Sequence, residues 1–243
     1  RCQIFTNAPA PHGAGALTLR QLPSGKTGFR VKFVLDSELR KRFILYLVGM
    51  NIMAVGIVLS TRSHLGVAAI SSVAYSYSIF CNISFGIANI ILFTIFIIIQ
   101  ALLIRSFSYA LLLQIPIAFF VGLFIDLYDI VIPDARFCFA ISLMLIVISN
   151  ILTGIGVYAM NKSNLVLDPG NAVVRTLCDV LDRPFSVLRI QFDVSLVLFT
   201  LFSGLLISNE VVGIGSGTII SAYLIGKSVG VTGKLLDRYI HFD

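Results

Sequence analysis

Three ionisable residues inside apolar stretches have the types and spacing that could support chemistry. Arg189 and Asp193 lie four residues apart in the stretch 187–207, and Lys227 lies in the middle of the stretch 211–232. Side chains four apart share one face of a helix, so Arg189 and Asp193 are expected to form either an ion pair or a proton or cation site. Lys227 is expected to extend to a polar boundary, to pair with Asp193 or to bind an anionic substrate.

Two shorter stretches, 66–80 and 168–183, carry polar side chains at helical spacing. This spacing predicts a polar helix face, which either contacts water and lipid headgroups or lines a polar cavity. A Pro-Gly pair at 169–170 could open the second helix and leave backbone N–H groups for an anion. The candidates for a substrate or ion site in these stretches are Ser71, Tyr75, Asn171, Arg175 and Asp168.

Other candidates concern helix packing and shape. Gln114 lies in an apolar stretch and needs a hydrogen-bond partner there, so it joins the candidate site. Pro116 can kink the same helix. Glycines in the last apolar stretch either permit close helix contact or mark an unwound segment that contacts the substrate. These glycines are Gly213, Gly217, Gly226 and Gly230.

The sequence offers no anchor for enzyme, metal or cofactor chemistry. The three histidines are far apart and the zinc-protease pattern HExxH does not occur. The four cysteines show no CxxC spacing, so they predict no zinc site. We therefore expect a protein that is not an enzyme and that holds neither metal nor cofactor.

The basic residues indicate a membrane rather than a nucleic acid as the partner. The net charge is +6, and eight of the eighteen Lys and Arg residues precede Phe43. A basic segment next to an apolar span reports orientation and contact with anionic lipid. We expect no nucleic-acid binding, because no motif for it accompanies the charge.

Composition narrows the class further. Of the 243 residues, 57% are hydrophobic and only 12% are charged, and the mean hydropathy is +0.96. A soluble domain of this length cannot bury so much apolar surface. The elements that must position the candidate residues are therefore membrane-spanning helices.

A helix needs about 20 apolar residues to cross the hydrocarbon core. One long uncharged run, Ser63–Ile104, could hold one span or two. The remaining predicted spans are Phe43–Thr61, Ser106–Ile125, Phe137–Asn161, about 187–207 and about 211–232.

An internal repeat indicates whether the run Ser63–Ile104 holds one span or two. When the chain is shifted by one hundred residues, Gly56 aligns with Gly156 and Phe85 aligns with Phe185. Further matches follow along the chain, and the sequence reads as two copies of one unit.

The second copy decides how the ambiguous segment behaves. The segment 168–183 is the counterpart of 66–80 and contains five ionisable residues, which prevent it from crossing lipid. Each copy, about 43–130 and about 137–240, then keeps three spans, and an odd number inverts the second copy. The sequence thus predicts an all-α polytopic membrane protein of six transmembrane helices. They form two inverted three-helix repeats, each with a short amphipathic or re-entrant helix after its first span.

The chain is expected to contain a flexible N-terminal extension, 1–39, and a transmembrane domain, 40–240. Basic residues concentrate in the loops on the side of the N-terminus. By the positive-inside rule, both termini are expected to be cytoplasmic.

Three segments, Thr61–Tyr75, 113–126 and 217–226, resemble motifs of the YitT/YczE-like family of uncharacterised bacterial integral membrane proteins. The segment Thr61–Tyr75 is similar to the family's signature after the first span. Residues 113–126 resemble its third span, and 217–226 its last. His64 stands where the family often has an acidic residue. The resemblance implies a multi-pass protein of the bacterial inner membrane whose biochemical function is unassigned.

The function that we expect is transport or export of a small solute through a polar site at the repeat interface. The alternatives are a substrate-capture or accessory subunit of a separate partner complex, or a scaffold without transport. The expected partners are the lipid bilayer, an unidentified small solute and either a second copy or an energising complex.

Overall fold

The computed structural model describes residues 37–105, 109–135, 137–210 and 212–236. The regular structure in these ranges is entirely α-helical, in eight helices. The expected extension 1–39 and the end of the second predicted repeat, 237–240, lie largely outside the described residues. The helices are α1 (Ser37–Arg62), α2 (Ala69–Phe80), α3 (Phe85–Ile104), α4 (Tyr109–Val131), α5 (Phe139–Ser163), α6 (Pro169–Leu181), α7 (Phe185–Ile207) and α8 (Ser216–Leu236).

Six of these helices are long and apolar enough to cross a membrane: α1, α3, α4, α5, α7 and α8. The two short helices, α2 and α6, cannot span it. This supports a multi-pass membrane protein, as composition predicts.

Local sequence explains where the long uncharged run divides. Asn82 adopts a left-handed backbone conformation with φ of 52° just after α2. The Ser84 hydroxyl then accepts the Ile87 N–H, which caps the start of α3. The run therefore contains one short helix, one turn and one span.

The last span begins later than the sequence predicts. The segment from Gly213 to Gly215 is a loop rather than helix, and Gly213 has a φ of +77°, which favours glycine. The Val67 N–H donates to the Gly213 carbonyl at 3.0 Å, and the Gly217 N–H donates to the Leu65 carbonyl at 2.7 Å. These two bonds hold the α7–α8 loop against the α1–α2 loop, so α8 starts at Ser216 and not at 211.

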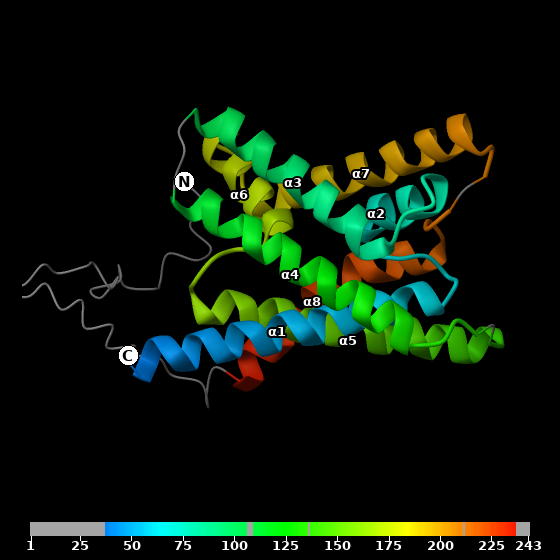
Figure 1. Cartoon of the computed structure of the whole chain (residues 1–243), viewed down its shortest axis with the longest axis horizontal. Coiled ribbons are helices and arrows are strands. Elements are labelled where there is room, and N and C mark those ends of the chain that lie inside the picture. The colour runs from blue at the N-terminus through cyan, green and yellow to red at the C-terminus, as the bar shows by residue number, and fades with distance from the viewer. Residues whose placement is uncertain (1–36, 106–108, 136, 211, 237–243) are drawn as a thin grey trace, which may run out of the picture.

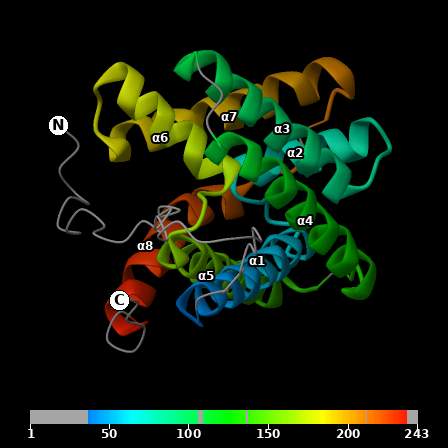
Figure 2. The same ribbon diagram turned by 60° about the vertical axis from the view of Figure 1, so that its left-hand side comes forward.

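The helices form two layers (Figure 2). α1 and α5 pack along each other in opposite directions, with α4 on α1 and α8 on α5. The other layer contains α3, α6, α7 and α2, in which α3 packs on α6 and α7 packs on α2. α3 also packs on α4, which joins the layers.

Glycines set the closeness of the central α1–α5 pair. A Cβ atom built on Gly156 would lie 2.6 Å from the Gly49 carbonyl oxygen and 2.7 Å from the Met53 Cβ. One built on Gly56 would lie 2.7 Å from the Thr153 backbone nitrogen. The two helices can approach this closely only because these positions lack side chains.

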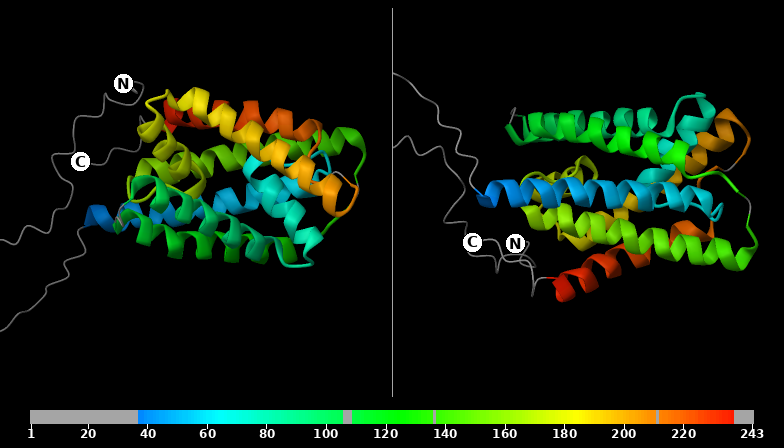
Figure 3. Two further views of the ribbon diagram at one scale, coloured as in Figure 1. Left: turned by 90° about the horizontal axis from the view of Figure 1, so that it is seen from above. Right: turned by 60° about the horizontal axis from the view of Figure 1, so that its bottom comes forward.

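The short helices lie at opposite ends of the bundle (Figure 1). α2 lies where α1 ends, and α6 lies where α1 begins. The start of α1 and the end of α8 are at the same end of the molecule (Figure 3).

Candidate functional site

A chain of polar side chains runs from the start of α6 to the first half of α7. The Asp168 carboxylate caps α6, accepting the Asn171 N–H at 3.1 Å and the Asn171 side-chain amide at 2.5 Å. The Asn171 side-chain oxygen, Oδ1, accepts a hydrogen bond from the Arg189 guanidinium at 2.7 Å. The Arg189 Nε donates to Asp193 Oδ2 at 3.0 Å. Four of the residues selected from sequence thus form one connected network.

Local structure explains why these side chains meet. Asp168 and Pro169 occupy the cap and the first position of α6, which are preferred places for these residue types. Arg189 and Asp193 are one helical turn apart on α7, and α7 packs against α6. The network is therefore fixed by one helix cap and one helix face.

The network lies within the protein and contains polar atoms that lack partners. Asp168 is 6% exposed, and the Asp193 side chain is 19% exposed. Within the described residues, the buried Asp193 Oδ1 has no hydrogen-bond partner. The buried Tyr46 hydroxyl of α1, within electrostatic range of Asp168, has none either. Buried unpaired polar atoms cost about 1–3 kcal/mol each, so these two atoms make the network a candidate for a functional site.

Arg175 and Lys227 do not join this network. Both side chains are exposed. Lys227 lies over the Tyr223 ring and donates to its hydroxyl at 3.3 Å on the outer face of α8. Asp193 pairs with Arg189, so the pairing of Lys227 with Asp193 that the sequence allows is not made here.

Gln114 has a partner that sequence reasoning did not identify. It is buried in α4 and exchanges two side-chain amide hydrogen bonds with Gln100 of α3, at 3.1 and 3.2 Å. Pro116 lies inside α4, away from both ends of the helix. The Gln100–Gln114 pair satisfies both amides and joins two helices, remote from the α6–α7 network in sequence.

The polar face of α2 is turned into the protein. Ser71 is buried, and Tyr75 is half-buried with its ring edge-to-face against Phe85 at 5.6 Å between centroids. Burial raises the pKa of Tyr75 above its usual value and the Asp134 carboxylate raises it further, while Arg62 opposes them. The Tyr75 hydroxyl therefore stays protonated, and Ser71 on the same face is covered by the chain itself.

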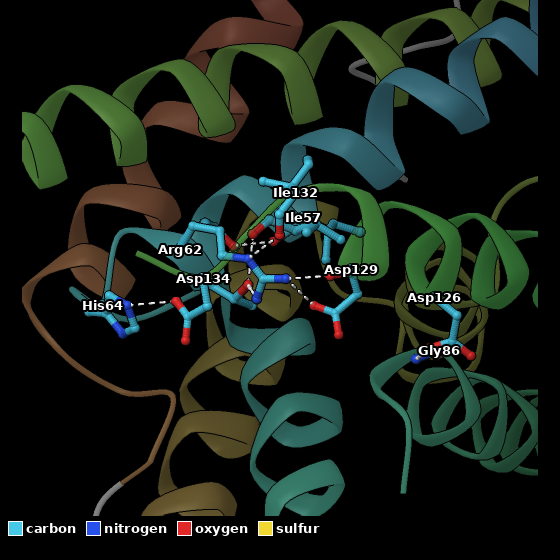
Figure 4. Close-up of polar contacts among 11 residues, drawn as sticks. Ile57, Arg62, His64, Gly86, Asp126, Asp129, Ile132 and Asp134 are labelled. Carbon is cyan, nitrogen blue, oxygen red and sulfur yellow. Dashed lines mark hydrogen bonds and ion pairs between the residues drawn. The ribbon is translucent and has the colours of Figure 1, made fainter. Parts of the chain in front are cut away.

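A second charged cluster lies at the other end of the bundle (Figure 4). Arg62 is 9% exposed and donates to Asp129 Oδ1 at 2.8 Å and to the carbonyls of Asp129 and Ile132 at 2.7 and 3.0 Å. His64 Nε2 lies 2.9 Å from Asp134 Oδ1 in an exposed pair. Arg62 therefore fastens the end of α1 to the end of α4, a contact that sequence reasoning missed.

Asp126 has a structural role close to this cluster. Its Oδ1 accepts the Gly86 N–H at 2.6 Å and its Oδ2 accepts the Ser84 hydroxyl at 2.8 Å. An acceptor at a helix N-terminus satisfies free donors and complements the helix dipole. The cluster's polar groups are occupied in holding helix ends, which makes the α6–α7 network the stronger candidate site.

The chain matches the model of a family of unknown function, DUF6198, over residues 40–234. It belongs to this family. The comparisons with curated proteins and with solved structures gave no match. The match supports an uncharacterised family, as expected, and gives no support to the YitT/YczE name specifically.

The four candidate glycines of this DUF6198 chain lie in two different settings. Gly217 lies against the α1–α2 loop, where a Cβ on it would be 2.8 Å from the Gly66 oxygen, and a Cβ on Gly213 would be 3.1 Å from the Ser76 hydroxyl of α2. Gly226 and Gly230 have no described atom within 4 Å of such a Cβ. The close helix contact expected at Gly226 and Gly230 is therefore not made, because α8 turns this face away from the bundle.

The segment Gly226–Gly230 also has the GxSxG spacing of hydrolase nucleophile motifs. That motif requires a sharp strand-to-helix turn, whereas this segment lies inside α8 and its serine, Ser228, packs on Gly154 of α5. Among the described residues, no group of three or more His, Cys, Asp or Glu side chains could hold a metal ion.

Proposed function

We propose that this membrane protein transports or exports a small polar solute, and that the α6–α7 network is part of its binding site. The observation that carries the proposal is the buried Asp193 Oδ1, unpaired among the described residues beside an Arg189–Asp193 ion pair. Charged groups inside membrane segments are costly and usually mark a solute, ion or proton path. A solute with a positive charge or a hydrogen-bond donor would satisfy this oxygen.

The proposed architecture is two inverted repeats, about 43–130 and about 137–240. Its support is that a long, a short and two long helices follow one another twice. Each of α1, α3 and α4 runs opposite to its counterpart α5, α7 or α8 (Figure 1). The packing contacts also correspond between the two halves. α1 packs on α4 as α5 packs on α8, and α2 packs on α7 as α6 packs on α3. In many secondary transporters, such repeats form the solute site where they meet. The α6–α7 network belongs to the second repeat, and α6 packs on α3 of the first.

The proposed setting is the bacterial inner membrane with both termini cytoplasmic. Its support is the excess of Lys and Arg in the loops at the end where α1 begins and α8 ends.

The test is uptake into proteoliposomes of a defined panel of amino acids, polyamines and small organic cations. At least one solute should be taken up by the wild type. The Asp193→Asn variant should lower that uptake about 10-fold or more, the size expected for loss of one charge-assisted hydrogen bond.

The matched control is Asp134→Asn, because Asp134 belongs to an exposed pair at the other end of the bundle. It should leave uptake unchanged. Equal uptake by wild type and Asp193→Asn, for every solute that moves, would remove Asp193 from the site.

A second candidate function is a substrate-capture or accessory subunit. The exposed faces of α7 and α8 favour it, since only 17% of the most apolar part of α7 and 11% of that of α8 are buried within the chain. This function predicts that a stoichiometric ATPase partner co-purifies in mild detergent, and that the isolated chain binds but does not move a solute.

A further inference from the structure

The two halves of the molecule differ in one helix pairing. α3 and α4 pack closely: Gln100 and Gln114 exchange hydrogen bonds, and Gly86 and Gly122 are in contact. Their counterparts in the proposed repeat, α7 and α8, have no comparable interface in the described part of the chain. α8 packs on α5 instead, and its C-terminal end stands apart from the other helices (Figure 3).

The unpacked pair contains two charged groups in unfavourable settings. Lys227 is exposed near the middle of α8, and its ammonium group donates a hydrogen bond to the exposed Tyr223 hydroxyl. A lysine side chain extends roughly 6 Å, which does not cover the roughly 15 Å from the centre of the hydrocarbon core to its edge. Asp193 on α7 has one buried oxygen without a partner in the described residues.

These two groups lie at similar distances along their helices from one end of the bundle. Asp193 is eight residues after the start of α7 at Phe185, and Lys227 is nine residues before the end of α8 at Leu236. Both of those helix ends lie at the same end of the bundle (Figure 1). A rise of 1.5 Å per residue puts both side chains about 12–14 Å from that end.

We infer that α8 closes onto α7 in a second state, in which Lys227 pairs with Asp193. This inference rests on the proposed repeat organisation, because the closed α7–α8 pair would match the packed α3–α4 pair. Closure covers the exposed Ile190 on α7, removes the lysine from lipid and supplies the missing partner of Asp193 Oδ1. Gly226 and Gly230, open on the same side of α8, allow the two helices to come close.

Lys227 is thus a positioning residue that links the proposed site to the movement of α8. While α8 is away from α7, Lys227 does not compete for the buried Asp193 Oδ1, so a solute with a donor group that reaches this oxygen can bind it. Once α8 has closed, Lys227 occupies the same oxygen. Solute and Lys227 therefore compete for one acceptor.

The test is disulfide cross-linking between Ile190→Cys and Val231→Cys in a background without native cysteines. Ile190 lies five residues after the start of α7 and Val231 five before the end of α8, and both are exposed, so neither substitution disturbs the core. Oxidation by copper phenanthroline in membranes should give a cross-link within single chains. No intramolecular cross-link would overturn the inference, and cross-links only between chains would make this face of α8 an interface between copies.

Two further variants test the charge pair. Lys227→Met should lower the intramolecular yield several-fold, whereas the matched control Lys234→Met, also exposed on α8, should not. The charge exchange Asp193→Lys with Lys227→Asp should restore part of the yield lost in either single variant. Equal yields in wild type and Lys227→Met would overturn the pairing. Because cross-linking needs no solute, these outcomes are independent of whether transport is found.

Discussion

At the scale of single residues, the polar groups described above either hold helices together or belong to the candidate site. Arg62, Asp126 and Gln114 each satisfy groups on another helix. The α6–α7 network differs, because it leaves a buried carboxylate oxygen without a described partner. This difference can be measured, since a residue that holds helices should affect stability more than uptake.

Arg62 is expected to be such a structural residue. Arg62→Met leaves the Asp129 carboxylate and two carbonyl oxygens without their donor. The free energy of unfolding in mixed detergent micelles should fall by about 2–3 kcal/mol. His64→Ala removes an exposed pair at the same end and should cost about 1 kcal/mol or less. Similar losses in both variants would contradict the structural role of Arg62.

The Gln100–Gln114 pair predicts a non-additive result. Gln114→Leu leaves the buried Gln100 amide unpaired and should destabilise by about 1–3 kcal/mol. Adding Gln100→Leu removes the orphaned group, so the double variant should be more stable than the sum of the single effects implies. A double-mutant cycle of unfolding free energies measures this coupling, and additive effects would show that the two amides act independently.

At the scale of helices, close packing depends on where glycines face. The sequence places glycines in both α5 and α8 but does not say which face meets a neighbour. That depends on the rotation of each helix about its axis, which tertiary packing decides. Gly156 lies against α1, whereas Gly226 faces outward.

A matched pair of substitutions tests this assignment. Gly156→Ala forces a methyl group against the α1 backbone and should destabilise by about 1–3 kcal/mol. Gly226→Ala meets no described atom and should be neutral or stabilising by up to about 1 kcal/mol. Thermal unfolding in detergent compares them, and equal destabilisation would mean that the face at Gly226 is already occupied.

Helix bounds show what the sequence can and cannot predict. Apolar runs predicted α5 and α7 to within two residues and α1 to within six, because apolar length is the direct requirement for a span. The start of α8 was placed five residues early, because Gly213–Gly215 is apolar enough for a span but is held as a loop by main-chain bonds to residues 65–67. A bond between segments so distant in sequence leaves no periodic signal.

At the scale of the whole molecule, composition and charge predicted the class, and the repeat predicted the order of long and short helices. The candidate site was predicted in part. Helical spacing joined Arg189 to Asp193, while the link through Asn171 to Asp168 depends on how α6 meets α7. The separation of α8 from α7 could not be predicted, because the corresponding helices of the first half, α3 and α4, pack against each other.

Side-specific labelling tests the topology of the whole chain. In a background without native cysteines, Asp134→Cys and Asp182→Cys lie in loops at opposite ends of the bundle. A membrane-impermeant maleimide added to intact cells should label position 134, and position 182 should react only after permeabilisation. Labelling of both positions from the same side would contradict the proposed six-span, inverted arrangement.

The two main-chain bonds between residues 65–67 and 213–217 also bear on how the protein is made. A ribosome releases the α1–α2 loop almost one hundred and fifty residues before its partner loop emerges. During that interval the Val67 N–H and the Leu65 carbonyl must rely on water or on temporary neighbours. Joining the first loop to the last is therefore a late event in assembly. A chain stalled before residue 213 would leave the α1–α2 loop without these two bonds and accessible to quality-control proteases.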